Sequence, residues 1–83
     1  MNTEILGTFL DITQQICPMT FVRTKLLIES MVVGETATVR LLGAEPLLNV
    51  PRSVREHGHK IISLEPETPN DLDGPYLLII EKA

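Results

Sequence analysis

Tryptophan is absent from this chain of 83 residues, tyrosine occurs once and phenylalanine twice. The core of the domain must therefore be built from aliphatic side chains. Cysteine occurs only once, at Cys17, which excludes an internal disulfide and indicates a reducing compartment. No apolar run is long enough to span a bilayer, and the first residues lack the features of a signal peptide. These absences predict a cytoplasmic protein with no membrane association.

Basic residues are in the minority, since 7 Lys and Arg accompany 11 Asp and Glu and the formal net charge is −4. This balance disfavours direct binding of nucleic acid. The sequence contains no glycine-rich phosphate loop and no paired-carboxylate signature. His57 and His59, separated by one glycine, do not form a zinc-ligand spacing with the distant Cys17, so no metal site is expected.

The hydrophobic pattern predicts six elements in the order β-α-β-α-β-β. Strands are expected at 8–12, 36–42, 60–65 and 76–81, the first helix at 18–31, and the second before Gly58. In the second helix, Pro51 predicts either a short helix capped near Asn49 or a kink in a longer one. The stretch 66–75, with three prolines and a glycine, is expected to be a long loop.

One domain, residues 1–83, is expected, with residues 1–7 as a flexible lead-in. The first two strands should be parallel because a helix connects them, and the last two should pair as a hairpin. Two helices are too few to cover both sheet faces. The predicted fold is therefore an α/β (α+β) two-layer sandwich, a four-stranded mixed sheet with both helices on one face. Ile61, Leu77 and Ile79 are expected on the open face, where they would favour self-association, although the oligomeric state stays unknown.

Cys17 is followed directly by Pro18, where the first strand gives way to the first helix. Proline is favoured at the first helical position, which predicts Cys17 as the N-cap and Pro18 as the first helical residue. At that place, unpaired N–H groups and the positive end of the helix dipole would stabilise the thiolate, the reactive form of cysteine. The alternative is that Cys17 is a small buried hydrophobe without reactivity.

Further features accompany this pair. Asp11 lies six residues before Cys17, Gly34 precedes the second strand, and the proline-bearing second helix ends at Glu56-His57-Gly58-His59. Together these features resemble the TusA/SirA family of small sulfur-carrier proteins over residues 8–82. The resemblance implies a β-α-β-α-β-β fold similar to the C-terminal domain of bacterial translation initiation factor 3.

The resemblance also implies a function, that of a sulfur carrier or persulfide sulfurtransferase. Cys17 would accept sulfane sulfur from a donor protein, such as a cysteine desulfurase or a rhodanese-like protein. It would hold the sulfur as a persulfide and relay it to a downstream acceptor. No cofactor is implied beyond this transient cysteine persulfide. The alternative is a non-catalytic interaction or regulatory module on the same fold, in which Cys17 is inert.

The chain departs from the family pattern in two places. The usual motif is Cys-Pro-x-Pro, but residues 17–20 are Cys-Pro-Met-Thr, and Gln14 replaces the usual glycine. These departures indicate a divergent subfamily with a different partner. Unlike proline, Thr20 offers a backbone N–H to the Cys17 side chain and adds a hydroxyl one turn from the sulfur. The alternative is that Thr20 faces water. The residues expected to shape the site are Asp11, Pro18 and Thr20.

The expected first helix carries two apolar stripes. The stripe formed by Phe21, Thr24, Ile28 and Met31 is predicted to face the core. The second stripe starts beside Cys17, and a two-layer domain has only one interior for this helix. This stripe is therefore predicted to be a docking surface, with cover by the second helix or the N-terminal tail as the alternative. The residues assigned to partner binding are Met19, Val22, Arg23, Leu26, Arg52 and Arg55.

Overall fold

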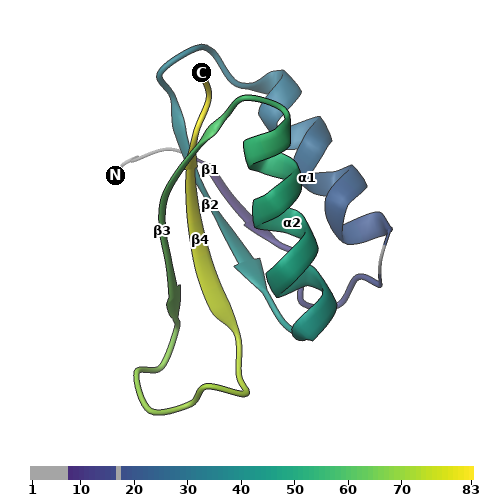
Figure 1. The fold of residues 1–83 in the computed structure, drawn as a ribbon, viewed down its shortest axis with the longest axis vertical. Coiled ribbons are helices and arrows are strands. Elements are labelled where there is room, and N and C mark those ends of the chain that lie inside the picture. The colour runs from purple at the N-terminus through teal and green to yellow at the C-terminus, as the bar shows by residue number, and fades with distance from the viewer. Residues whose placement is uncertain (1–7, 17) are drawn as a thin grey trace.

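The computed structural model describes residues 8–16 and 18–83. The strands are β1 (Thr8–Asp11), β2 (Thr36–Leu41), β3 (Lys60–Pro66) and β4 (Tyr76–Glu81), and the helices are α1 (Met19–Ser30) and α2 (Ala44–Glu56). Figure 1 shows the two helices side by side in one layer and the sheet in the other. The predicted two-layer sandwich and its order of elements are confirmed. Within the described residues, neither helix is long and apolar enough to cross a bilayer.

The sheet has the strand order β1-β2-β4-β3. Strand β1 pairs with β2 in parallel, and β4 pairs with both β2 and β3 in antiparallel orientation. The predicted parallel pair and the predicted hairpin are both confirmed. The last strand in sequence thus occupies a central place in the sheet.

The core lies between the helix layer and one face of the sheet. Strand β2 contributes its alternate residues, as the period-two pattern predicts, and α1 and α2 each contribute one face. No aromatic side chain belongs to this core among the described residues, which confirms the expectation of an aliphatic interior. The buried hydrophobic residues are Ile12, Ile28, Met31, Ala37, Val39, Leu41, Val50, Val54, Leu78 and Ile80.

Helix α2 adopts the longer of the two predicted forms, since it begins at Ala44 and contains Pro51. Asn49 lies inside the helix, so its predicted role as a nearby cap is wrong. The N-cap position is occupied by Gly43, whose φ of 109° is a conformation that side chains other than glycine rarely adopt. Pro51 cannot donate a backbone hydrogen bond to Leu47, but it is buried against the core, and this packing offsets the lost bond.

The open face of the sheet differs from the prediction at Ile61. A β-bulge between Ile61 and Ser63 lets Ile61 pair with the buried Ile80, and Ile61 packs against the core. Its predicted place on the open face is therefore wrong, and the extra residue Ile62 is exposed instead. Leu77 and Ile79 do alternate with buried residues and are only partly covered. Self-association through this face stays a prediction.

Candidate functional site

The connection from β1 to α1 carries the candidate site. The backbone N–H of Ile12 donates to the carbonyl oxygen of Arg40 on β2 at 3.1 Å, and the Ile12 side chain is fully buried. The N–H of Gln15 then donates to the carbonyl of Ile12 at 3.0 Å. These two hydrogen bonds fix the start of the connection between β1 and α1 against the end of strand β2.

Asp11 shapes the turn that follows β1. Its Oδ1 accepts hydrogen bonds from the backbone N–H and the hydroxyl of Thr13, at 2.9 and 2.7 Å. Its Oδ2 accepts a hydrogen bond from Nη1 of Arg40 at 3.2 Å. The bonds from Thr13, and after them the Arg40 guanidinium, hold the pKa of the Asp11 carboxyl below its ordinary value of 3.8. Asp11 is therefore ionised at neutral pH and holds the turn at Thr13.

Helix α1 begins one residue later than predicted. Pro18 is the N-cap and Met19 the first helical residue, because the Pro18 ψ of 4° departs from the helical value. Cys17, the predicted catalytic residue, lies outside the described residues. The backbone is tied on both sides of it: the N–H of Met19 donates to the carbonyl of Ile16 at 2.8 Å, and the N–H of Val22 to that of Pro18 at 3.0 Å.

Thr20 faces the interior of the protein. It is fully buried, so the alternative in which it faces water is wrong. Its carbonyl oxygen accepts a hydrogen bond from the hydroxyl of Thr24 at 2.9 Å. The predicted hydrogen bond between Thr20 and Cys17 stays a prediction, because one partner lies outside the described residues.

The two faces of α1 differ as the sequence predicts. Thr24, Ile28 and Met31 are buried, whereas Phe21 is only half-buried at the edge of the core stripe. The second stripe, Met19, Val22 and Leu26, is exposed by 43%, 36% and 58%. We call these three residues the α1 stripe. The alternative of partial cover by α2 or the N-terminal tail stays a prediction.

Ile16 is a site residue that the sequence analysis missed. Its side chain is 79% exposed although it lies directly before Cys17 and one turn away from the α1 stripe. The sequence does hold an indication of this residue. Ile16 is an isoleucine in an otherwise polar connection, and it belongs neither to the apolar pattern of the first strand nor to that of the first helix. Ile16 is thus a further exposed apolar side chain in the connection that leads to α1.

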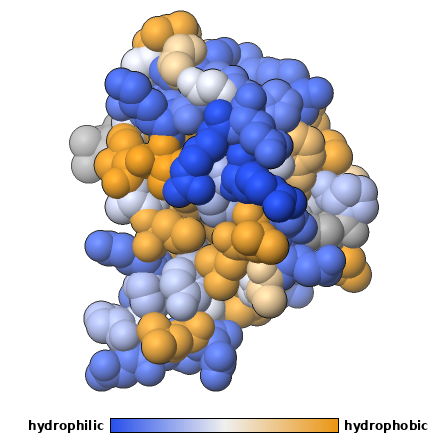
Figure 2. Space-filling view, in the orientation of Figure 1, coloured by the Kyte–Doolittle hydropathy of each residue, from blue (hydrophilic) through white to orange (hydrophobic). Residues whose placement is uncertain are grey.

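The three arginines assigned to partner binding lie on both helices. Arg23 is exposed on α1, and Arg52 and Arg55 are exposed on α2. Figure 2 shows strongly hydrophilic residues over the C-terminal end of α2 and hydrophobic residues over its other end. The guanidinium of Arg52 donates to the side-chain oxygen of Asn49 at 2.8 Å. The helix layer therefore presents charged side chains beside exposed apolar residues.

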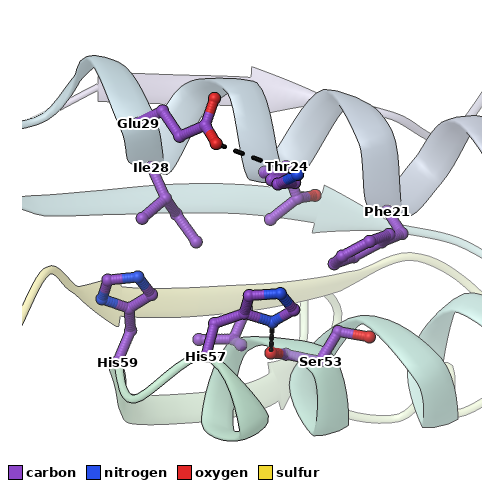
Figure 3. A pocket seen from close by; sticks show the side chains of 9 residues that line it. Phe21, Thr24, Ile28, Glu29, Ser53, His57 and His59 are labelled. Carbon is purple, nitrogen blue, oxygen red and sulfur yellow. Dashed lines mark hydrogen bonds and ion pairs between the residues drawn. The ribbon is translucent and has the colours of Figure 1, made fainter.

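A small cleft of about 70 Å³ opens between α1 and α2 (Figure 3). The Phe21 ring lies on one wall and the His57 ring on the other, with centroids 5.7 Å apart. His57 Nδ1 is 2.8 Å from the carbonyl of Ser53, and His59 Nδ1 accepts from the backbone N–H of Ala83 at 3.2 Å. No group of three or more His, Cys, Asp or Glu suited to a metal ion occurs in the described part of the chain.

Comparison with known proteins identifies the family of this chain. Residues 8–82 match the protein family described as "Sulfurtransferase TusA". The chain belongs to the TusA family. A protein of Archaeoglobus fulgidus named "Putative sulfur carrier protein" is 46% identical over 57 residues, which are 68% of this chain and 64% of that protein. The match thus spans less than two thirds of the relative's length.

A solved structure of a SirA-like protein from Desulfitobacterium hafniense has the same fold. Its TM-score is 0.69, with 23% sequence identity, over 89% of this chain and 95% of that chain. At this identity the likeness concerns the fold alone. The predicted family and fold class are both confirmed.

Proposed function

We propose that this TusA-family protein is a sulfur carrier that holds sulfane sulfur on Cys17. The observation that carries the proposal is the family match over residues 8–82 in a chain with one cysteine. Sulfur bound as a persulfide needs a thiolate, and the chain has one thiol to supply it. No resident cofactor is needed, because the persulfide itself carries the sulfur.

The transfer step is a thiol–disulfide type of exchange. The Cys17 thiolate attacks the outer sulfur of a persulfide on the donor protein. The new S–S bond forms on Cys17, the S–S bond on the donor breaks, and the donor cysteine leaves as a thiolate. The same exchange in the opposite sense passes the sulfur to an acceptor thiolate. Electrons balance in each step, so no external oxidant or reductant takes part.

The surroundings of Cys17 support this role. The N–H groups of the first turn of α1 follow directly after Pro18, and the positive end of a helix dipole favours an anion. Asp11 and Thr13 form the turn that precedes Cys17 in the chain. Pro18 and Thr20 belong to the start of α1, which follows Cys17. We therefore assign Asp11, Pro18 and Thr20 to shaping the site.

Docking of the donor is assigned to the surface beside Cys17. Ile16 and the α1 stripe offer apolar area, and such area is a common mark of an interaction site. Arg23, Arg52 and Arg55 add positive charge on the neighbouring surfaces of α1 and α2. This combination suits a donor that surrounds its own reactive cysteine with apolar and acidic side chains.

The experiment that tests the proposal is mass spectrometry of the intact protein after incubation with a cysteine desulfurase and cysteine, or with a rhodanese and thiosulfate. The mass should rise by about 32 Da, the mass of one sulfur atom taken by one thiolate. Cys17→Ser should gain nothing, and reduction with dithiothreitol should remove the added mass from the wild type. A wild-type protein that gains no sulfur from either donor would contradict the proposal.

A second function is favoured by the exposed α1 stripe, because a docking surface can serve a non-catalytic interaction module as well. In that case Cys17 would be inert. The two functions differ in the behaviour of Cys17→Ser. A carrier loses its activity with this substitution, whereas an interaction module keeps its full affinity for its partner.

A further inference from the structure

Arg40 contacts the segment before Cys17 in two ways. Its backbone carbonyl accepts the N–H of Ile12 at 3.1 Å, and its guanidinium Nη1 donates to Asp11 Oδ2 at 3.2 Å. Arg40 lies on β2 directly opposite Asp11 in the parallel register. One residue of the neighbouring strand thus contacts both the end of β1 and the first residue beyond it.

The other side of the Arg40 guanidinium is held by Glu67. Nε donates to the two carboxylate oxygens of Glu67 at 3.2 and 3.1 Å, and Nη2 donates to Oε1 at 2.9 Å. Glu67 is itself fixed, because its backbone N–H donates to the carbonyl of Pro75 at 2.9 Å across the loop. A bidentate pair fixes the plane of the guanidinium as well as its position.

These contacts form one chain of hydrogen bonds from the β3–β4 loop to the turn before Cys17. Glu67 orients Arg40, Arg40 orients Asp11, and Asp11 holds the backbone and the hydroxyl of Thr13. Asp11 accepts from Thr13 at Oδ1 and from Arg40 at Oδ2, so its carboxylate is held from both sides.

Stability alone gives a weak reason for such an arrangement. The side chains of Arg40, Asp11 and Glu67 are 28%, 44% and 36% exposed. Ion pairs with this much exposure usually contribute little to folding. The same contacts restrict orientation, because a fork of several donors allows few arrangements of the carboxylates around it.

We propose that Arg40, oriented by Glu67, is a positioning residue for the sulfur-transfer reaction, in that it fixes the Asp11–Thr13 turn from which the chain runs to Cys17. This inference rests on the proposed function for its kinetic consequence. Its structural part, the dependence of the Thr13 turn on Arg40, stands independently of sulfur transfer.

The test compares Arg40→Gln, Arg40→Lys and the control Lys60→Gln. Lys60 is an exposed cation on the edge strand β3, so its substitution changes the net charge equally without touching the turn. Arg40→Gln should raise the hydrogen-exchange rate of the Thr13 amide roughly two- to fivefold, the factor that a partly exposed ion pair usually contributes. Lys60→Gln should leave this rate unchanged. Arg40→Lys should resemble Arg40→Gln, because a single ammonium cannot bridge both carboxylates in the same plane.

Two further measurements connect the turn to Cys17. The alkylation rate of Cys17 by uncharged iodoacetamide should change in Arg40→Gln and remain as in the wild type in Lys60→Gln. With a donor protein, the rate of sulfur uptake at saturating donor should fall roughly two- to fivefold, the same factor as for the Thr13 turn. The half-saturating donor concentration should stay constant, because Arg40 is not part of the α1 stripe. If Arg40→Gln does not fold, Glu67→Gln replaces it, since this variant keeps the Arg40–Asp11 contact and should show a smaller shift in the same direction.

The possible results separate clearly. Unchanged Thr13 exchange and unchanged alkylation in a folded Arg40→Gln protein would overturn the inference, and full rescue by Arg40→Lys would show that charge rather than orientation matters. A changed half-saturating concentration would place Arg40 in the docking surface and also overturn it. A wild-type protein that never accepts sulfur would end the proposed function, while Thr13 exchange would still decide the role of Arg40.

Discussion

The α1 stripe allows a quantitative test of donor docking. The perturbation is the double substitution Val22→Gln and Leu26→Gln, which removes apolar surface and retains good helix formers. Val22 is 36% exposed and Leu26 58% exposed, so together they expose about as much as one complete side chain. Full burial of such a side chain stabilises a complex by roughly 1.5–3 kcal/mol. The double variant should therefore bind its donor about 10- to 100-fold more weakly.

The same exposure predicts a small effect on folding. The methylene groups of glutamine continue to cover the helix surface, and substitutions at exposed sites usually change stability by about 0.5 kcal/mol each. For the double variant we expect a loss of about 1 kcal/mol, or about 4–8 °C in Tm for a domain of this size. Ile28→Ala provides the contrast, because Ile28 is only 6% exposed and its truncation should cost about 2–5 kcal/mol.

The assay is calorimetric titration with the donor that loads the wild type, combined with thermal unfolding of each variant. Val32→Gln with Val33→Gln is the matched control, since these valines are 70% and 75% exposed and lie beyond the end of α1. Its affinity for the donor should equal that of the wild type. A large loss of stability in the Val22 and Leu26 variant would show that the stripe belongs to the core. Unchanged affinity would refute the docking argument and direct attention to Arg23, Arg52 and Arg55.

Two further predictions concern titratable groups. The alkylation rate of Cys17 plotted against pH should have its midpoint below the ~8.5 of a free thiol, because the nearby start of α1 favours the thiolate, and a midpoint at or above that value would argue for an inert cysteine. The lowered pKa of Asp11 means that its carboxylate stabilises the folded state above 3.8, and that this stabilisation is lost as the pH falls through the lower folded value. The free energy of unfolding in urea should therefore be higher for the wild type than for Asp11→Asn at neutral pH, and the two values should converge well below pH 3.8. A difference that does not change with pH would disprove the lowered pKa of Asp11.

The order of the elements along the chain and two of the three strand pairings, β1–β2 and β3–β4, could be predicted from local patterns, whereas the β2–β4 pairing and the strand order could not. The alternation in β2, the prolines and glycine of the 66–75 loop and the helix between the first two strands each restrict the chain strongly. The details that failed depend on context instead. Asn49 lies inside α2 and not at a cap, and Ile61 turns inward because of a β-bulge that no local pattern indicates.

The contacts around Arg40 were also beyond prediction from the sequence. Arg40 is separated from Asp11 by 29 residues and from Glu67 by 27, so no periodicity relates the three. In the sequence Arg40 is an ordinary polar residue on the outer side of an alternating strand. Its significance arises only when the strand register places it opposite Asp11 and the loop returns beside it.

The central place of β4 has a consequence for the synthesis of this protein. As the chain emerges from the ribosome, β1, α1 and β2 can form a local unit early, but β2 and β3 have no common neighbour until residues 76–81 appear. Glu67 is likewise anchored only once Pro75 is present. During translation at about 5–20 residues per second, Cys17 is therefore synthesised several seconds before the sheet can close. Nascent chains of this protein should be most vulnerable to thiol oxidation in that interval.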